Sequence, residues 1–461
     1  MTITRIKKLQ KGHFSKEFLQ KIAATEPQWM REKRLEAYTL YESLPMPHTT
    51  EDDVWRRTVD MRTQDYWRRT RRFLRGLDVE KYHLSLPTNG QPSTTDVDYS
   101  DEEASGLLVQ VDGQRQHVSE SEELKKKGVY FADLHTALQE QPELLRDYFM
   151  NKAVTLETGL KSGNIAQHNK FDALHGAFWQ GGYLLHVPKG VNVEVPLRVY
   201  IKMSETAQAD LSHTLIIAEE GSQVVVLEES ASTTSDASGL HSGAVEIFAG
   251  QNANVTYVQV QRWNRTVWNF ASHRAMVARD AQICWVSATF GGRLNKLNQA
   301  SILEGAGSNA QMLGLAFTDA RQHLDVSTAQ EHISPHTTSD LMYRTVLKDR
   351  AQTAWGGNIY VYPSANYTDA YQKNDNLLLS ERAHADTLPG LEIQAHEVRC
   401  THGATAGKID ADQVFYLMSR GVSYAQAEKL IVDGFFEPVM ERIPLESVRE
   451  ELSTSIARKL E

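Results

Sequence analysis

The sequence predicts a mainly β protein with a core of stacked β coils, a β-helix or a similar β-solenoid, over residues 156–407. The first observation is an internal repeat with a period of about 30 residues along the middle of the chain. The second is that short alternating or apolar segments, such as residues 224–227, 255–260 and 283–286, follow its copies. Helical spacing is confined to the two ends of the chain. A β-sandwich is the alternative, but it explains the regular turn less well.

Each copy of the repeat consists of a turn residue, a small residue and usually an amide. The small residues are spaced 31, 31, 28, 29, 41 and 32 residues apart, and they are Val191, Ser222, Ala253, Ala281, Ala310, Ala351 and Ala383. Such a period is typical of solenoids, in which each coil buries its apolar face only against its neighbours. The interval of 41 residues contains residues 331–339, which we expect to bulge from a coil as a surface loop.

Residues 1–155 are predicted to form an N-terminal helical region, because apolar residues recur at helical spacing over 15–74 and 131–149. Residues 87–123 are rich in Ser, Thr, Asp, Glu and Gly, which predicts a flexible linker or mobile insertion. A group of arginines interleaved with aromatic residues precedes it: Arg56, Arg57, Arg62, Arg68, Arg69, Arg71, Arg72 and Arg75. No nucleic-acid motif accompanies these arginines, so a solvated helix face or a protein contact is favoured over nucleic-acid binding.

Residues 408–461 are predicted to form a C-terminal helical domain. Asp410 with Gln413 and Ser423 with Gln426 have the capping-box spacing that opens helices. Pro438 and Pro444 are expected to break the helical run before a last helix over residues 445–460. Such a domain at the end of a solenoid is expected to cap the open core, either alone or while also docking a partner.

Composition limits the function classes. The 461 residues include 41% hydrophobic residues, enough for a sizeable core, and carry a net charge of −10, which argues against general affinity for nucleic acid or anionic membrane. The chain has no apolar run of membrane-spanning length and its first residues do not resemble a secretory signal, so a cytoplasmic location is expected. Two cysteines 116 residues apart, Cys284 and Cys400, do not suggest a disulfide framework.

The most informative candidates for chemistry are Cys400 and His402. Residues i and i+2 of a strand point to the same face, so this thiol and imidazole could address one ligand; His396 shares the face if the strand is regular. Both are metal-ligand types, yet a closed site needs about four ligands and the sequence offers too few locally. The alternative without a metal is a small buried thiol beside a histidine that hydrogen-bonds to a backbone carbonyl.

A second histidine pair, His332 and His336, lies within the longest repeat interval, where a surface loop without a metal is favoured. Residues 403–409 resemble a phosphate-binding loop only partly, because three residues separate the glycines and Ile409 replaces the required hydroxyl; no nucleotide is therefore expected to bind there. Two functions remain open. One is a carbohydrate-active β-solenoid enzyme using carboxylates such as Asp325, Asp340 and Asp369. The other is a scaffold whose Cys400 and His402 meet ligands from another chain.

Several short motifs resemble those of the SufB/SufD family of iron-sulfur cluster assembly proteins, and of its SufD branch in particular. Over residues 331–435 they are His332 with Pro335, Thr338 and Ser339, then residues 376–380, 389–393, 400–405, 415–417 and 419–421; upstream, residues 171–175 and 187–190 are also similar. SufB-like chains carry a cysteine where this chain has Ala383, and a Glu where it has Gly403. Both departures favour SufD.

The resemblance implies a right-handed parallel β-helix core with helical N-terminal and C-terminal domains. It implies a non-catalytic scaffold that pairs with a SufB-like subunit through the β-helix and with a SufC-like ATPase through the C-terminal helices, or forms a homodimer without SufB. A transient iron-sulfur cluster or iron would be held at the interface, with His402 and Cys400 as this chain's metal-binding residues. No nucleotide bound by the chain itself, no nucleic acid and no membrane is expected.

Overall fold

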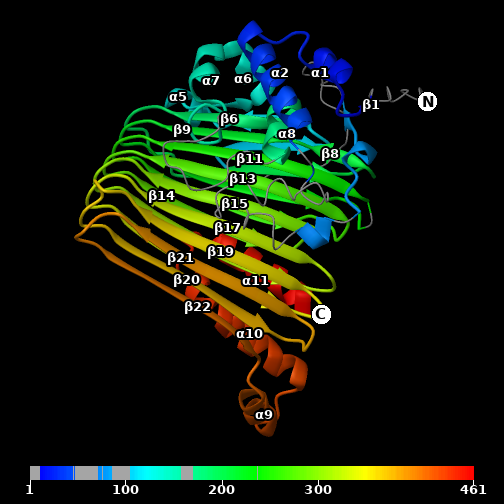
Figure 1. Cartoon of the computed structure of the whole chain (residues 1–461), viewed down its shortest axis with the longest axis vertical. Coiled ribbons are helices and arrows are strands. Elements are labelled where there is room, and N and C mark those ends of the chain that lie inside the picture. Colours follow the sequence, from blue (N-terminus) through cyan, green and yellow to red (C-terminus); the bar gives the residue numbers. More distant parts are fainter. Residues whose placement is uncertain are drawn as a thin grey trace.

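Two parallel sheets stacked into a solenoid of about eight turns dominate the molecule, with helices near both ends of the chain (Figure 1). The computed structural model describes residues 11–44, 46, 71–74, 76–85, 104–156, 170–235 and 237–460. The predicted mainly β solenoid is therefore confirmed. No described helix is both long and apolar enough to cross a membrane.

Each coil contributes one strand to each sheet. In spatial order, sheet 1 is β22 (Arg399–Lys408), β20 (Asp369–Leu378), β18 (Thr338–Leu347), β16 (Asn309–Thr318), β14 (Gln282–Thr289), β12 (Asn254–Arg262), β10 (Gln223–Ser232), β7 (Leu197–Met203), β3 (Gly106–Val111) and β4 (Gln114–Glu120). Sheet 2 is β21 (His384–Ile393), β19 (Gln352–Val361), β17 (His323–His332), β15 (Leu294–Leu303), β13 (Val267–Val277), β11 (Gly239–Ala249), β9 (His213–Ala218), β6 (Gly182–Val187) and β5 (Tyr130–Asp133), with β8 (Gln208–Asp210) beside β11. The pairs β3–β4 and β5–β6 are antiparallel, whereas the coils pair in parallel.

The strand register explains the sequence repeat and its one long interval. The copies from Val191 to Ala310 lie where the chain enters sheet 1, and Ser339, which pairs with Ala310, continues them after 29 residues. Ala351 and Ala383 instead precede strands of sheet 2. The interval of 41 residues therefore joins two different turns. The predicted surface loop is confined to the turn over residues 333–337, and its wider extent is wrong because residues 331–332 end β17 and 338–339 begin β18.

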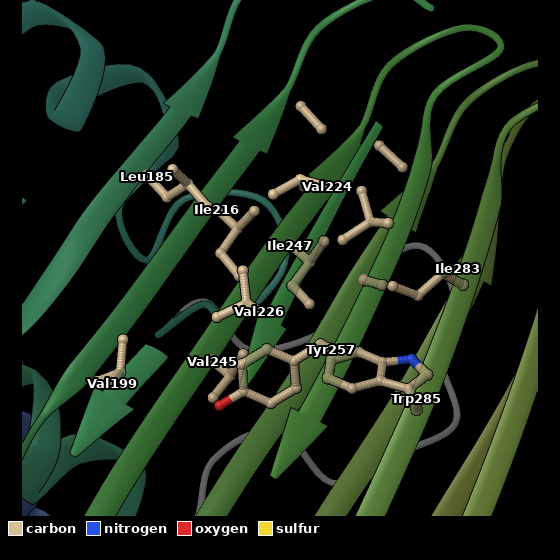
Figure 2. Packing of buried hydrophobic residues seen from close by; sticks show 14 of the residues in the cluster. Leu185, Val199, Ile216, Val224, Val226, Val245, Ile247, Tyr257, Ile283 and Trp285 are labelled. Carbon is tan, nitrogen blue, oxygen red and sulfur yellow. The ribbon is translucent and has the colours of Figure 1, made fainter. Parts of the chain in front are cut away.

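The core forms from columns of inward side chains that stack from coil to coil. One column runs along sheet 1 through Leu197, Val226, Tyr257, Trp285, Met312, Leu341, Gln372 and His402. Figure 2 shows the apolar part of this packing, in which Tyr257 is the neighbour of both Val226 and Trp285, with Val245 and Ile247 of sheet 2 in the same cluster. Burial of each large apolar side chain contributes roughly 1.5–3 kcal/mol, so the stack stabilises itself wherever a further coil follows.

The N-terminal region packs its helices against the first coils. Its helices are α1 (Lys16–Ile22), α2 (Gln28–Ser43), α5 (Glu122–Lys126), α6 (Leu134–Glu140), α7 (Pro142–Tyr148) and α8 (Lys170–Phe178), with short 3-10 turns Arg71–Leu74 and Val79–Lys81 and a small β1 (Lys11–Gly12) to β2 (Leu84–Ser85) pair. The linker prediction is wrong for residues 106–120, because the β3–β4 hairpin buries Leu107, Leu108 and Val109 against β7. Residues 86–103 and most of the arginine cluster, including Arg56 to Arg69 and Arg75, lie outside the described residues.

The C-terminal helices α9 (Ala411–Ser419), α10 (Tyr424–Met440) and α11 (Glu446–Leu460) follow the last strand. The Ser423–Gln426 capping box forms, and the Asp410 side chain accepts hydrogen bonds from the amides of Asp412 and Gln413. Pro438 does not break α10, since it lies in the last turn, where only one backbone hydrogen bond is lost. Apolar residues of α10 and α11, among them Phe436 and Leu452, pack on the outer face of sheet 1. These two helices therefore cover a sheet face, and the expectation that they cap the solenoid end is wrong.

Candidate functional site

The two candidate ligands lie on β22, the last strand of sheet 1. Cys400 pairs with Ala370, and His402 pairs with Gln372. The side chains of Ala370 and Gln372 point into the solenoid and are buried. Because strand residues alternate between faces, Cys400 and His402 share the inward face of the final coil. His402 thus takes the position that Trp285, Met312 and Leu341 fill in earlier coils.

Among the described strands, β22 is the last in sheet 1 and β21 the last in sheet 2 (Figure 1). No described strand therefore covers the inward face at this end. On β21, Leu391 and Ile393 pair with the buried Ile359 and Val361, yet are 38% and 42% exposed. We call the inward side chains Leu391, Ile393, Cys400 and His402 the open end. The sequence alone did not single out Leu391 and Ile393 as site residues, because their exposure depends on which coil is last.

The Cys400 thiol is half-buried against Ile359, Val361, Ala365 and Ala370. Burial raises its pKa, and the nearby Asp369 carboxylate raises it further, while a backbone hydrogen bond at Ala370 acts in the opposite direction. The isolated chain therefore holds Cys400 mainly as a neutral thiol, which is a poorer metal ligand than a thiolate. A positive metal ion supplied at an interface would favour deprotonation.

The second cysteine is not part of this site. Cys284 lies on the outer face of β14, where its Sγ donates a hydrogen bond to Gln311 Oε1 at 3.4 Å. Four strand steps separate β14 from β22, or about 19 Å at the usual spacing. Burial raises the pKa of Cys284 to about 12, so this thiol is unreactive.

The neighbouring histidines take different places. His402 is exposed on β22, whereas His396 lies in the turn before the strand, with its amide near Asn366 Oδ1, so the expected common strand face with His396 is wrong. Ala383, where SufB-like chains carry cysteine, packs with Leu347 and Ala351 at the other end of β21. Among the described residues, no group of three or more His, Cys, Asp or Glu side chains is arranged to hold a metal ion.

His332 and His336 do not form a ligand pair. His332 is fully buried, with Nδ1 2.7 Å from Thr337 Oγ1 and Nε2 2.8 Å from Ser339 Oγ. Burial lowers its pKa to about 3. His336 lies in the turn at φ 58° and stacks on Tyr367, with ring centroids 4.8 Å apart.

The three carboxylates considered for an enzyme do not converge. Asp325 is buried in sheet 2 in an ion pair with Lys296 at 2.8 Å. In sheet 1, Asp340 pairs with Arg442 at 2.7 Å and Asp369 lies 3.6 Å from Arg399. Each is matched to a cation, and they provide no acid and base facing one groove.

The fold and the site together define a β-solenoid protein whose last coil presents a partial ligand set beside exposed apolar residues. Comparison with known proteins agrees with this class. Residues 200–435 match the SUF system FeS cluster assembly SufBD core domain, and residues 95–199 match the SufBD protein N-terminal region. The chain belongs to the SufB/SufD family of iron-sulfur cluster assembly proteins.

Curated relatives cover nearly the whole chain. An iron-sulfur cluster assembly SufBD family protein of Staphylococcus epidermidis is 30% identical over 423 residues, spanning 91% of this chain and 87% of that protein. Family proteins of Staphylococcus haemolyticus and Staphylococcus aureus are each 29% identical, with the same shares covered. These matches establish the family, and they do not separate its SufB from its SufD branch.

Proposed function

We propose that the chain is a SufD-type, non-catalytic scaffold subunit, in which the open end pairs with a SufB-like subunit and shares a nascent cluster or iron with it. The observation that carries this proposal is the position of Cys400 and His402 on the inward face of the last, uncovered coil. An iron or iron-sulfur substrate needs about four ligands, and two from this chain leave the remainder to a partner. Ala383 and Gly403, which differ from SufB-like chains, support the SufD assignment.

The surroundings of this pair favour an interface over a solvent-exposed site. Leu391 and Ile393 offer apolar surface across from the ligands, and the edges of β21 and β22 offer backbone groups for strand pairing. A docked partner would exclude water, and nearby apolar groups would then strengthen the electrostatic interaction between thiolate and metal. The same open end could pair two copies of this chain when the SufB-like subunit is missing.

A SufC-like ATPase would dock on α9 and the first turns of α10. Phe415 and Tyr416 of α9 and Leu430 of α10 are largely exposed, while Val414 is buried. Large exposed aromatic residues on a helix are typical of protein interfaces.

The test compares His402→Ala with His396→Ala, a nearby exposed histidine outside the strand. The complex with SufB-like and SufC-like chains is purified anaerobically, and its iron and acid-labile sulfide are measured. Loss of one of about four ligands should lower cluster content about tenfold or more in His402→Ala, with complex yield unchanged. His396→Ala should behave as wild type. Normal cluster content in His402→Ala would refute the ligand role.

A further inference from the structure

A row of exposed arginines follows one corner of the solenoid. The chain turns from sheet 1 into sheet 2 at this corner, and each of the last five such turns carries one arginine: Arg265, Arg293, Arg321, Arg350 and Arg382. Backbone hydrogen bonds link these turns in order; for example, the Arg350 amide donates to Ala320 O and the Gln352 amide to Gln322 O. Neighbouring arginines in the row are therefore about one coil apart, or about 4.8 Å along the axis.

Three arginines in this row have no partner in the described part of the chain. Arg265 pairs with Asp319 at 2.6 Å, and the Arg293 guanidinium lies 4.8 Å from the Trp268 ring centroid. Arg321, Arg350 and Arg382 make no ion pair or side-chain hydrogen bond with any described residue.

The acidic residues near this corner do not neutralise its cations, so the corner carries a net positive charge. Asp319 also pairs with Lys459 at 3.1 Å, so two cations share one carboxylate. Asp349 accepts a hydrogen bond from the Ala320 amide, and Glu381 is exposed beside Arg382. Lys348 adds a further cation and reaches the carbonyl of Leu460. A concentration of positive charge in a chain of net charge −10 indicates a site for an anion.

The arginine row borders a cavity of about 750 Å³. Its described lining consists of Phe73, Arg265, Arg293, Ala320, Arg321, Gln322, Arg350 and Gln352. This volume lies within the range of sites for small molecules and cofactors. Phe73 stacks on His323 with ring centroids 3.7 Å apart, which fixes an aromatic ring at the cavity wall.

We propose that this cavity binds a small oligophosphate, such as a nucleoside diphosphate or inorganic triphosphate. Guanidinium groups match phosphate oxygens with paired hydrogen bonds, and arginines repeated once per coil can engage successive phosphates of one ligand. The site differs from the partial phosphate-loop resemblance at residues 403–409. It also lies at the corner opposite the turn that leads into Cys400, so ligand binding there would leave the open end uncovered.

Isothermal titration calorimetry of the full chain with inorganic triphosphate and with ADP tests this proposal. The double variant Arg321→Ala/Arg350→Ala should bind both at least about tenfold more weakly, because each arginine supplies charge-assisted hydrogen bonds. Arg279→Ala, at an exposed arginine in a turn of the opposite corner, should bind as wild type. Phe73→Leu distinguishes the two sources, since weaker binding of ADP alone would identify a nucleotide.

Unchanged affinity in the double variant, or no binding of either probe by the wild-type chain, would overturn the proposal. Equal affinity for sulfate at the same ionic strength would also overturn it, because that would indicate a general anion patch. A single-stranded DNA oligonucleotide that binds more tightly than triphosphate through the same two arginines would replace the small molecule with nucleic acid. Unchanged melting temperatures of both variants would establish that folding is intact.

Discussion

At the scale of single residues, burial separates histidines that the sequence presents alike. His332 and His402 both point into the solenoid, one from sheet 2 and one from sheet 1. Later coils cover His332, and its ring nitrogens are satisfied by the hydroxyls of Thr337 and Ser339. No coil of the described chain covers His402, and its side chain is exposed to a ligand or partner. The number of coils that follow a residue thus decides whether its side chain serves structure or interaction.

Acidification should destabilise the fold through His332. The unfolded imidazole has a pKa near 6.5 and the folded one about 3, so the unfolded state binds more protons between these values and stability falls as pH is lowered through this window. From pH 7 to pH 5 this one group should remove about 2 kcal/mol of stability. His332→Gln should therefore make the pH dependence of the melting temperature between pH 7 and 5 less steep, while the buried His213 and His273, whose pKa values are also lowered to about 3, keep their own contributions. An equally steep dependence in His332→Gln would show that other groups control it.

At the scale of elements, α9 differs from the two helices that follow it. α10 and α11 bury apolar residues on sheet 1, whereas α9 buries Val414 and leaves Phe415 73% exposed. Large aromatic side chains that are exposed in the free protein and become buried on docking are typical of interface hot spots. The N-cap at Asp410 holds the helix in place without requiring those aromatic side chains.

Replacing Phe415 and Tyr416 together with serine should abolish stable capture of a SufC-like ATPase. Loss of two aromatic anchors should weaken binding on the order of 100-fold while the melting temperature stays within about 2 °C of wild type. Leu35→Ser, at an exposed apolar residue of α2, is the matched control. The measurement is co-purification followed by titration of the purified ATPase, and full affinity in the double variant would place the contact elsewhere.

At the scale of the whole molecule, no described element caps the end of the solenoid formed by β21 and β22. Its first coils are joined by the β3–β4 hairpin and β5, and α10 with α11 cover an outer face, but β21 and β22 end their sheets. Edge strands with apolar neighbours tend to pair with other chains. A chain that remains monomeric would be more soluble with charged side chains at such an end. The exposed apolar side chains Leu391 and Ile393 therefore indicate a binding partner.

A charge placed on the open end should prevent that pairing. Leu391→Lys/Ile393→Lys should eliminate the complex with a SufB-like subunit, and any homodimer, as measured by light scattering of the co-expressed and separate chains. Leu388→Lys is the control, because Leu388 is 55% exposed on the same strand but points to the outer face. The melting temperature should change little, since neither side chain is covered by a further coil. A complex that forms normally with the charged open end would require a different interface.

Local patterns in the chain were sufficient for the coil period, the capped C-terminal helices and the common strand face of Cys400 and His402. Local patterns were not sufficient where contacts with neighbouring elements determined the structure of a segment. Residues 106–111, the apolar part of the segment predicted as a linker, form a strand because they pair with β7 and bury Leu107, Leu108 and Val109. Helix α10 continues through Pro438 because the proline falls in its last turn. Residues 331–339 suggested a loop because one turn motif occurs at both corners of the solenoid.

By itself, the sequence determined that this protein stacks coils and that a thiol and an imidazole lie two residues apart on one strand, since side-chain alternation and repeat period are local properties. Only the tertiary structure decided that their strand is the last one, that Leu391 and Ile393 are exposed across from it, and that arginines from five turns form one row. Burial and proximity depend on which coils lie next to each other, and residues 30 or more apart in the chain become neighbours only when the coils stack.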